Sequence, residues 1–290
     1  MKLTGPGLGG IVTISADGMP PALPFTTDVP GGHRWDWRLT WRDQISRGSV
    51  TTPQGRWEAR AAIGPGGGVL DVTATAGAAS AKVIVRTGGT NPSAIQITAH
   101  LAHHPGAAGF DRIVVQESRG HQFAADGQPV VSFDGGVGLC QLTHPPATPA
   151  QAWDWRANLD AGLALFAAKH ALAERHLGQA GRRFTPDQVT REAVCLWNGG
   201  FYHVWDGAAW VRPATIVCDK HAGNIGWDMT DPANHGQPPA TLHARDVASY
   251  ARGRGAHWRY FGVCYADHIL GGWPLRPDDG RLYLWSRSDV

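Results

Sequence analysis

The sequence changes its periodicity near residue 90, and this change constrains the fold more than any other feature of the chain. From residue 10 to residue 87, short runs rich in β-branched and aromatic residues alternate with Gly/Pro turns. Runs of this length and spacing are typical of a small all-β domain. After Gly88 and Gly89 the apolar residues recur at helical spacing instead. We therefore expect a two-domain α+β protein with a boundary at residue 90.

The strand patterns before residue 90 predict one buried face. Trp35, Trp37 and Trp41 fall on odd positions, which places them on the same side of an extended strand. The segments 72–77 and 81–88 are typical of a β-hairpin. Several such strands at short spacing predict a β-sandwich of immunoglobulin or fibronectin type. We expect residues 1–90 to form an accessory or docking domain.

Helix signals follow this region. Asn91 before Pro92, and Thr185 before Pro186, are typical of an N-cap followed by proline in the first helical turn. Helical spacing recurs in residues 110–120, 151–177 and 185–200. Long Gly/Pro-rich loops separate these helices, and loops of this kind often carry functional sites. We expect residues 91–290 to form an α-rich domain.

The net charge and the lengths of the apolar runs argue against nucleic-acid binding and against a membrane-spanning helix. A net charge of +2 gives no electrostatic case for nucleic-acid binding. No stretch reaches the roughly 18 apolar residues of a membrane helix, and residues 1–18 lack the apolar core of a secretory signal. We expect synthesis in the cytoplasm, where the four cysteines would by default stay free thiols.

Glu117 is the first candidate for chemistry. It follows the apolar run 113–115 near the end of a predicted helix. An acidic side chain is locally unfavourable there, because the C-terminal end of the helix dipole is negative. On its own the pattern is more typical of a solvated surface carboxylate, and the motifs that follow it in the chain favour a functional interpretation.

Five short motifs occur in order between residues 95 and 270. They are Glu117-Ser118, Gly138-Leu139-Cys140-Gln141, Asn158 to Gly162, Trp197-Asn198-Gly199-Gly200, and Tyr265. In order and spacing this set resembles the soluble lytic transglycosylase and goose-type lysozyme family. Each motif alone is weak, whereas five in the correct order are fairly specific. The resemblance implies a lysozyme-like fold for residues 91–290 and an enzyme that cleaves peptidoglycan.

The resemblance assigns roles to the matched residues. Glu117 would be the catalytic acid and base, and the Ser118 hydroxyl would orient its carboxyl group. Gly138 and Gln141 would line the adjoining sugar subsite. Asn198 would border the cleft from the opposite side.

Three more residues complete the expected sugar-binding set. Cys140 stands where the family has Met, and Trp197 stands where it has Tyr, so the subsites differ from the family pattern. Tyr265 matches the family's aromatic hydroxyl near the catalytic carboxyl, with a position in the core as an equal alternative. Asn158 and Gly162 are expected to be structural: the amide ties a loop to its helix, and glycine permits close packing.

The resemblance also implies the reaction. Glycosidic cleavage needs an acid that protonates the leaving oxygen. In this family the sugar's own 6-hydroxyl then attacks the anomeric carbon, so cleavage of the MurNAc–GlcNAc β-1,4 bond leaves a 1,6-anhydroMurNAc end. One alternative is a lysozyme-like muramidase, in which Asp126 or Asp134 acts as second carboxylate. Another is a non-catalytic, glycan-binding or structural component of a secretion or phage-tail-like machine.

No metal or cofactor is expected. His100, His103 and His104 share one helical segment, and Cys218 and His221 have ligand-like spacing, but they do not complete a four-ligand zinc set. The expected partners are peptidoglycan glycan strands, with a secretion machine or an immunity protein as further candidates. Neither nucleic acid nor membrane insertion is expected. We expect an antibacterial effector that acts in the periplasm or cell wall after specialised export or lysis.

Overall fold

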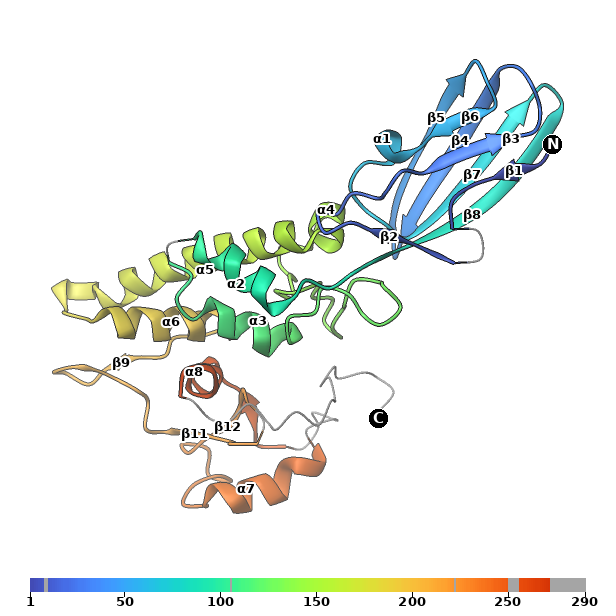
Figure 1. Cartoon of the computed structure of the whole chain (residues 1–290). Helices are drawn as coiled ribbons and strands as arrows, with labels where there is room; N and C mark the ends of the chain where they lie inside the picture. Colours follow the sequence, from blue (N-terminus) through green and yellow to red (C-terminus); the bar gives the residue numbers. More distant parts are fainter. Residues whose placement is uncertain (8–9, 105, 222, 250–255, 272–290) are drawn as a thin grey trace. The chain divides into compact units, whose positions relative to one another are not determined.

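The computed structural model describes residues 1–7, 10–104, 106–221, 223–249 and 256–271 (Figure 1). Over these residues it is a mixed α+β structure with eight α-helices and several sheets. The expected α+β class is therefore confirmed. Contacts divide the chain into two compact units, one comprising Met1–His100 with Glu117–Ala161 and the other comprising Leu101–Gln116 with Gly162–Val290.

Two sheets make up the N-terminal part of the first unit. The larger has the strand order β2-β8-β7-β4-β5 and the smaller has the order β1-β3-β6. Their strands are Leu3–Thr4 (β1), Ile11–Ile14 (β2), Pro24–Thr27 (β3), His33–Trp41 (β4), Gln44–Thr52 (β5), Arg56–Glu58 (β6), Val69–Ala76 (β7) and Ala79–Gly89 (β8). All neighbours pair antiparallel except β2 and β8, which are parallel. The predicted hairpin is confirmed as β7 and β8, which pair out to Ala76 and Ala79. A single helical turn, α1 (Arg60–Ile63), follows β6.

Residues from both sheets form one apolar core. Buried and solvent-facing residues alternate along β4, so Trp35, Trp37 and Trp41 are all buried, as the period of two predicted. Trp57 of the smaller sheet stacks on Phe25 and lies against Trp35, with ring centroids 5.7 and 5.9 Å apart. Aromatic rings thus hold the two sheets together.

Helix α2 (Ala94–Ala102) begins two residues later than an Asn91 cap requires, so that prediction is wrong. The Asn91 side chain instead bonds to the backbone of Phe123, accepting from its N–H at 2.7 Å and donating to its carbonyl at 2.8 Å. Ser93 takes the capping role, because its Oγ accepts from the N–H of Gln96 while Gln96 Oε1 accepts from the N–H of Ser93. The Asn91 side chain therefore does not cap the helix, because it bonds to a residue far along the chain.

The remaining helices are α3 (Phe110–Ser118), α4 (Pro149–Trp153), α5 (Trp155–Leu177), α6 (Pro186–Asn198), α7 (Pro239–Asp246) and α8 (Gly262–Leu270), with 3-10 turns at Gln179–Gly181 and Val247–Ser249. The Thr185 cap of α6 is confirmed: Thr185 Oγ1 accepts from the N–H of Gln188, and Gln188 Oε1 accepts from the N–H of Thr185. Within its described residues, no helix is long and apolar enough to span a membrane.

The second unit also contains two small antiparallel sheets that the sequence did not predict. Their strands are Val204–Trp205 (β9), Trp210–Val211 (β10), Ile216–Cys218 (β11), Ile225–Asp228 (β12) and Arg259–Tyr260 (β13). Strands of two to four residues are too short to show a period of two. A cluster of buried residues packs around β12 and α7, namely Ile225, Trp227, Leu242 and Trp258.

Deleting residues 1–88 should destabilise what remains of the first unit. Trp153 is 1% exposed and meets Trp41 edge-on, and the ring of Phe123 lies against the backbone of Gly89. Uncovering each large apolar side chain costs roughly 2–3 kcal/mol. We expect the truncated chain to melt at lower temperature and with less cooperativity than the full chain, as followed by near-UV circular dichroism. A fragment with an unchanged melting profile would support independent folding from residue 91.

Candidate functional site

The connection between α3 and α4, residues 119–148, carries Gly138, Cys140 and Gln141. A long irregular segment inside a compact unit needs partners for its buried backbone groups. Two side-chain amides supply them, those of Gln122 and Asn158, and both residues are 0% exposed. We call this pair the amide clamp.

Asn158 joins the loop to helix α5. Its Oδ1 accepts from the N–H of Cys140 at 2.9 Å. Its Nδ2 donates to the carbonyls of Val137 and Gln151 at 3.0 and 3.1 Å. The structural role predicted for this amide is confirmed, since it ties the loop to its helix.

Gln122 binds the same loop at Leu139, one residue before the Cys140 N–H that Asn158 binds. No motif in the sequence marks Gln122. Its Oε1 accepts from the N–H of Leu139 at 2.9 Å, and its Nε2 donates to the carbonyl of Ala152 at 2.8 Å. Glutamine is mostly exposed in folded proteins, so nothing local in the sequence marks this residue as buried. Its distance of five residues from Glu117 is the one signal that could have drawn attention to it.

Gly138 and Gln141 are shaped by this arrangement. Gly138 has a φ of +73°, and a Cβ there would lie 2.5 Å from Gln122 Oε1 and 2.6 Å from Asn158 Nδ2. Glycine is therefore required at this position. Gln141 also has a positive φ, 48°, and its Nε2 donates back to the carbonyl of Gly138 at 2.7 Å. Gln141 Oε1 is buried and has no hydrogen-bond partner among the described residues.

Glu117 and Ser118 end helix α3, with Glu117 half-buried and Ser118 only 4% exposed. Cys140 is buried, and burial raises the pKa of its thiol well above the usual range. The negative charge of Glu117 raises that pKa further. The carboxylate of Glu117 is thus within electrostatic reach of the loop that the amide clamp holds.

The two aspartates considered as a second carboxylate have local partners. Asp126 Oδ1 accepts from the N–H of Gln128 at 2.9 Å. Asp134 Oδ1 accepts from the Ser132 hydroxyl and from the N–H of Gly136. Both side chains are exposed. These are the bonds of turn-forming residues.

Trp197, Asn198 and Tyr265 belong to the second unit. Trp197 is half-buried and meets the rings of Phe110 and Phe166 edge-on, at 5.5 and 6.4 Å between centroids. Asn198 is exposed as the last residue of α6. Tyr265 is 2% exposed within α8. In this unit Asn198 is the predicted residue most open to a ligand.

A buried carboxylate that the sequence analysis missed organises the segment after α6. Glu192 is 0% exposed and accepts from the N–H of Tyr202 at 2.8 Å and from the N–H of His203 at 3.0 Å. Its Oε2 also lies 2.6 Å from Nδ1 of His203. The carboxylate is fully engaged in folding the chain back along α6, so its role is structural.

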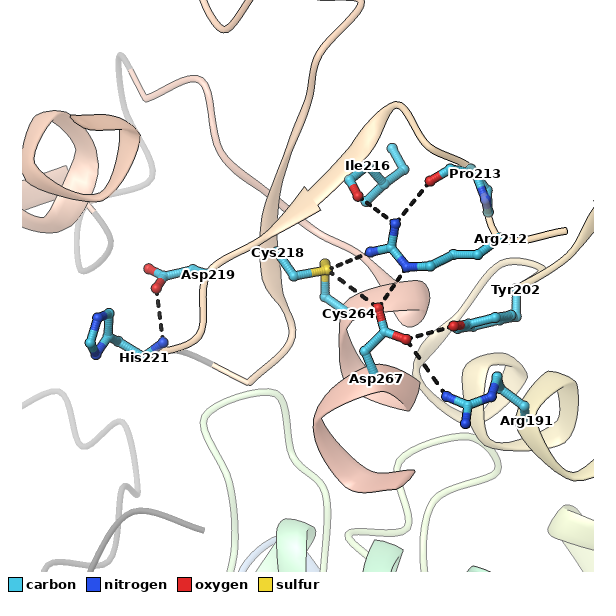
Figure 2. The surroundings of a disulfide bond; sticks show 10 residues. All are labelled: Arg191, Tyr202, Arg212, Pro213, Ile216, Cys218, Asp219, His221, Cys264 and Asp267. Carbon is cyan, nitrogen blue, oxygen red and sulfur yellow. Dashed lines mark hydrogen bonds and ion pairs between the residues drawn. A yellow bond between two sulfur atoms is a disulfide. The ribbon is translucent and has the colours of Figure 1, made fainter. Parts of the chain in front are cut away.

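The expectation of four free thiols is wrong for two of them, because Cys218 and Cys264 form a disulfide (Figure 2). The two residues are 46 apart in sequence, and only the fold brings β11 beside the start of α8. Cys140 and Cys195 are free and buried. Spacing alone could not have assigned the pair.

Asp267 is the centre of a polar cluster beside the disulfide (Figure 2). The Tyr202 hydroxyl donates to Asp267 Oδ1 at 2.6 Å, and Arg212 Nε donates to Oδ2 at 2.7 Å. Arg191 forms a longer ion pair at 3.6 Å. Burial, together with the bond to Asp267, raises the pKa of Tyr202 to about 12. Tyr202 therefore stays a neutral donor at physiological pH.

Comparisons of the chain with protein-family models, with curated proteins and with solved structures find no match.

Proposed function

We propose that this protein is a peptidoglycan lytic transglycosylase in which Glu117 is the single catalytic carboxylate. The observation that carries the proposal is the relation of Glu117 to the loop 137–141. Two fully buried amides hold that loop by its backbone, in the unit that also contains Glu117. A loop that is fixed by its backbone can hold side chains in one position, which suits a reaction that depends on positioning.

The chemistry needs a proton donor and then a proton acceptor in one place. Glu117, which is half-buried at the end of α3, would protonate the glycosidic oxygen as the sugar becomes oxocarbenium-like. It would then accept the proton of the 6-hydroxyl as this oxygen bonds to the anomeric carbon. Gln141 lies at the bend of this loop, and the resemblance places it in the adjoining sugar subsite.

The turn bonds of Asp126 and Asp134 favour the transglycosylase over the muramidase. A second carboxylate in a glycosidase must face the anomeric carbon or a water beside it. Each aspartate here is exposed and accepts bonds within its own turn. Because both carboxylates are engaged in their own turns, we favour the sugar's 6-hydroxyl as the nucleophile.

We also propose a specific fold for each of the two regions, residues 1–90 and residues 91–290. Two sheets that share an apolar core support a β-sandwich of immunoglobulin or fibronectin type for the N-terminal region. The succession of α3, α5, α6 and α8 supports a lysozyme-like domain. The disulfide suits action in an oxidising compartment such as the periplasm.

Digestion of purified sacculi tests the reaction through its products. We expect mass spectrometry to show 1,6-anhydro ends, lighter than hydrolysed ends by the mass of one water, because an intramolecular hydroxyl has a high effective concentration. Predominantly reducing ends would identify a muramidase and would make Asp126 and Asp134 the next residues to substitute. Intact sacculi after exhaustive incubation would remove the enzymatic proposal.

A further inference from the structure

Helix α8 is held from two sides. At its first turn Cys264 bonds to Cys218, the last residue of β11. On another side Gly262 approaches the end of α6 so closely that a Cβ would lie 2.1 Å from the carbonyl oxygen of Gly199. The helix that carries Tyr265 and Asp267 is thus fixed near its N-terminal end by a covalent bond and by backbone packing.

Arg212 connects the disulfide to the polar cluster on α8 (Figure 2). One edge of its guanidinium donates to Asp267 Oδ2, and Nη2 donates to the sulfur of Cys218 at 3.1 Å. Nη1 donates to the carbonyls of Pro213 and Ile216 at 2.9 and 2.7 Å. The Arg212 side chain therefore bonds to both β11 and α8.

The two cysteine residues of the disulfide differ in exposure. Cys218 is 9% exposed, whereas Cys264 is 0% exposed. Cys195 lies in the same unit, but burial raises the pKa of its thiol, so it is a poor internal attacker. An external thiolate would therefore reach the sulfur of Cys218 in preference to that of Cys264.

We propose that the Cys218–Cys264 bond is a redox latch, which anchors the first turn of α8 to β11 only under oxidising conditions. The co-reactant is a dithiol. Its thiolate attacks the sulfur of Cys218, the disulfide breaks, and Cys264 leaves as a thiolate that takes up a proton. The second thiol of the reductant resolves the mixed disulfide, so the dithiol is oxidised by two electrons and the protein disulfide is reduced. Arg212 stabilises the released Cys218 thiolate.

The latch has a consequence for activity that rests on the proposed function. Tyr265 directly follows Cys264, and Asp267 lies one helical turn beyond it. Reduction removes the covalent link between β11 and the first turn of α8, so packing and hydrogen bonds alone then hold this turn. Cleavage of glycan would then depend on the thiol–disulfide state of the compartment.

Hydrogen–deuterium exchange of the full chain, with and without dithiothreitol, tests the latch without any substrate. We expect the amides of α8 to exchange about a hundredfold faster after reduction, because a disulfide closing a loop of this size contributes strongly to local stability. The double variant Cys218→Ser/Cys264→Ser should exchange at the fast rate under both conditions. Cys195→Ala is the matched control and should still respond to dithiothreitol. Equal exchange of α8 in the oxidised and reduced protein would overturn the latch.

Sacculus digestion separates the latch from the proposed function. We expect reduced protein and the double variant to release glycan fragments at least tenfold more slowly than oxidised protein, since α8 packs against the end of α6, where the exposed Asn198 lies. Inactive oxidised protein would remove the proposed function, and the latch would then stand or fall on the exchange data. If α8 exchanges faster after reduction while digestion continues unchanged, α8 does not control the site and the regulatory inference is wrong.

Discussion

Glu117→Gln should reduce the turnover of peptidoglycan at least about a hundredfold and leave the melting temperature nearly unchanged. The amide keeps the size and shape of the carboxyl group but cannot donate and then accept a proton. Glu117 is half-buried at a helix end, where a neutral side chain removes an unfavourable interaction with the helix dipole. The reaction therefore loses its acid and base, while the side chain keeps its size and its capacity to form hydrogen bonds.

Release of soluble fragments from sacculi, measured beside a thermal melt, checks this expectation. Glu174→Gln is the matched control, because Glu174 is an exposed glutamate on α5 for which the reaction has no use. Turnover by the Glu117 variant close to that of the parent protein would exclude Glu117 as the proton donor.

Asn158→Ala should have the largest effect on the loop that carries the site. The substitution deletes three hydrogen bonds inside a fully buried environment and leaves the N–H of Cys140 and the carbonyl of Val137 without this partner. Buried groups left in this way cost about 1–3 kcal/mol each, so we expect the free energy of unfolding to fall by about 2–4 kcal/mol. Turnover should fall by more than the loss of folded protein explains, because the freed loop no longer holds Gln141 in position.

Asn234→Ala separates these two effects. Asn234 is also fully buried, and its amide donates to the carbonyls of Asp228 and His257 in the second unit. Urea unfolding should show a similar loss of stability for both variants. At a temperature where both are folded, only the Asn158 variant should have lost most of its turnover. Equal activity of the two variants would show that the clamp stabilises the fold without positioning the site.

The features that the sequence predicted correctly are those with local causes. Trp35, Trp37 and Trp41 share a face because successive side chains of a strand alternate. Thr185 caps α6 because its hydroxyl reaches an N–H only three residues away. Both patterns are complete within a short stretch of chain.

The features that escaped prediction depend on distant partners. Asn91 bonds to Phe123 rather than to its own helix, and Cys218 pairs with Cys264 across 46 residues. Gln122 is buried only because the loop 137–141 and the end of α4 surround it with backbone groups. No periodicity or spacing in the chain specifies such encounters, since they follow from the complete fold.

In the candidate site, too, some residues could be predicted from the sequence and others depend on the complete fold. Motif order was enough to point to Glu117, Gly138 and Gln141 within one unit, where the amide clamp now explains why residue 138 must be glycine. The motifs did not predict which carboxylates and amides are fully buried, such as those of Glu192 and Gln122. Burial is a property of the folded chain that residue type predicts poorly for polar side chains.

Every bond that the amide clamp makes ends on a main-chain atom, and this matters for how the protein can change over evolutionary time. The amides recognise the N–H groups of residues 139 and 140 and the carbonyls of residues 137, 151 and 152. They are indifferent to which side chain residue 140 carries. A lineage can therefore exchange Cys140 for another buried apolar residue of fitting size and retain the course of the loop. Variation of the side chains packed along the loop is in this way uncoupled from inheritance of its backbone course.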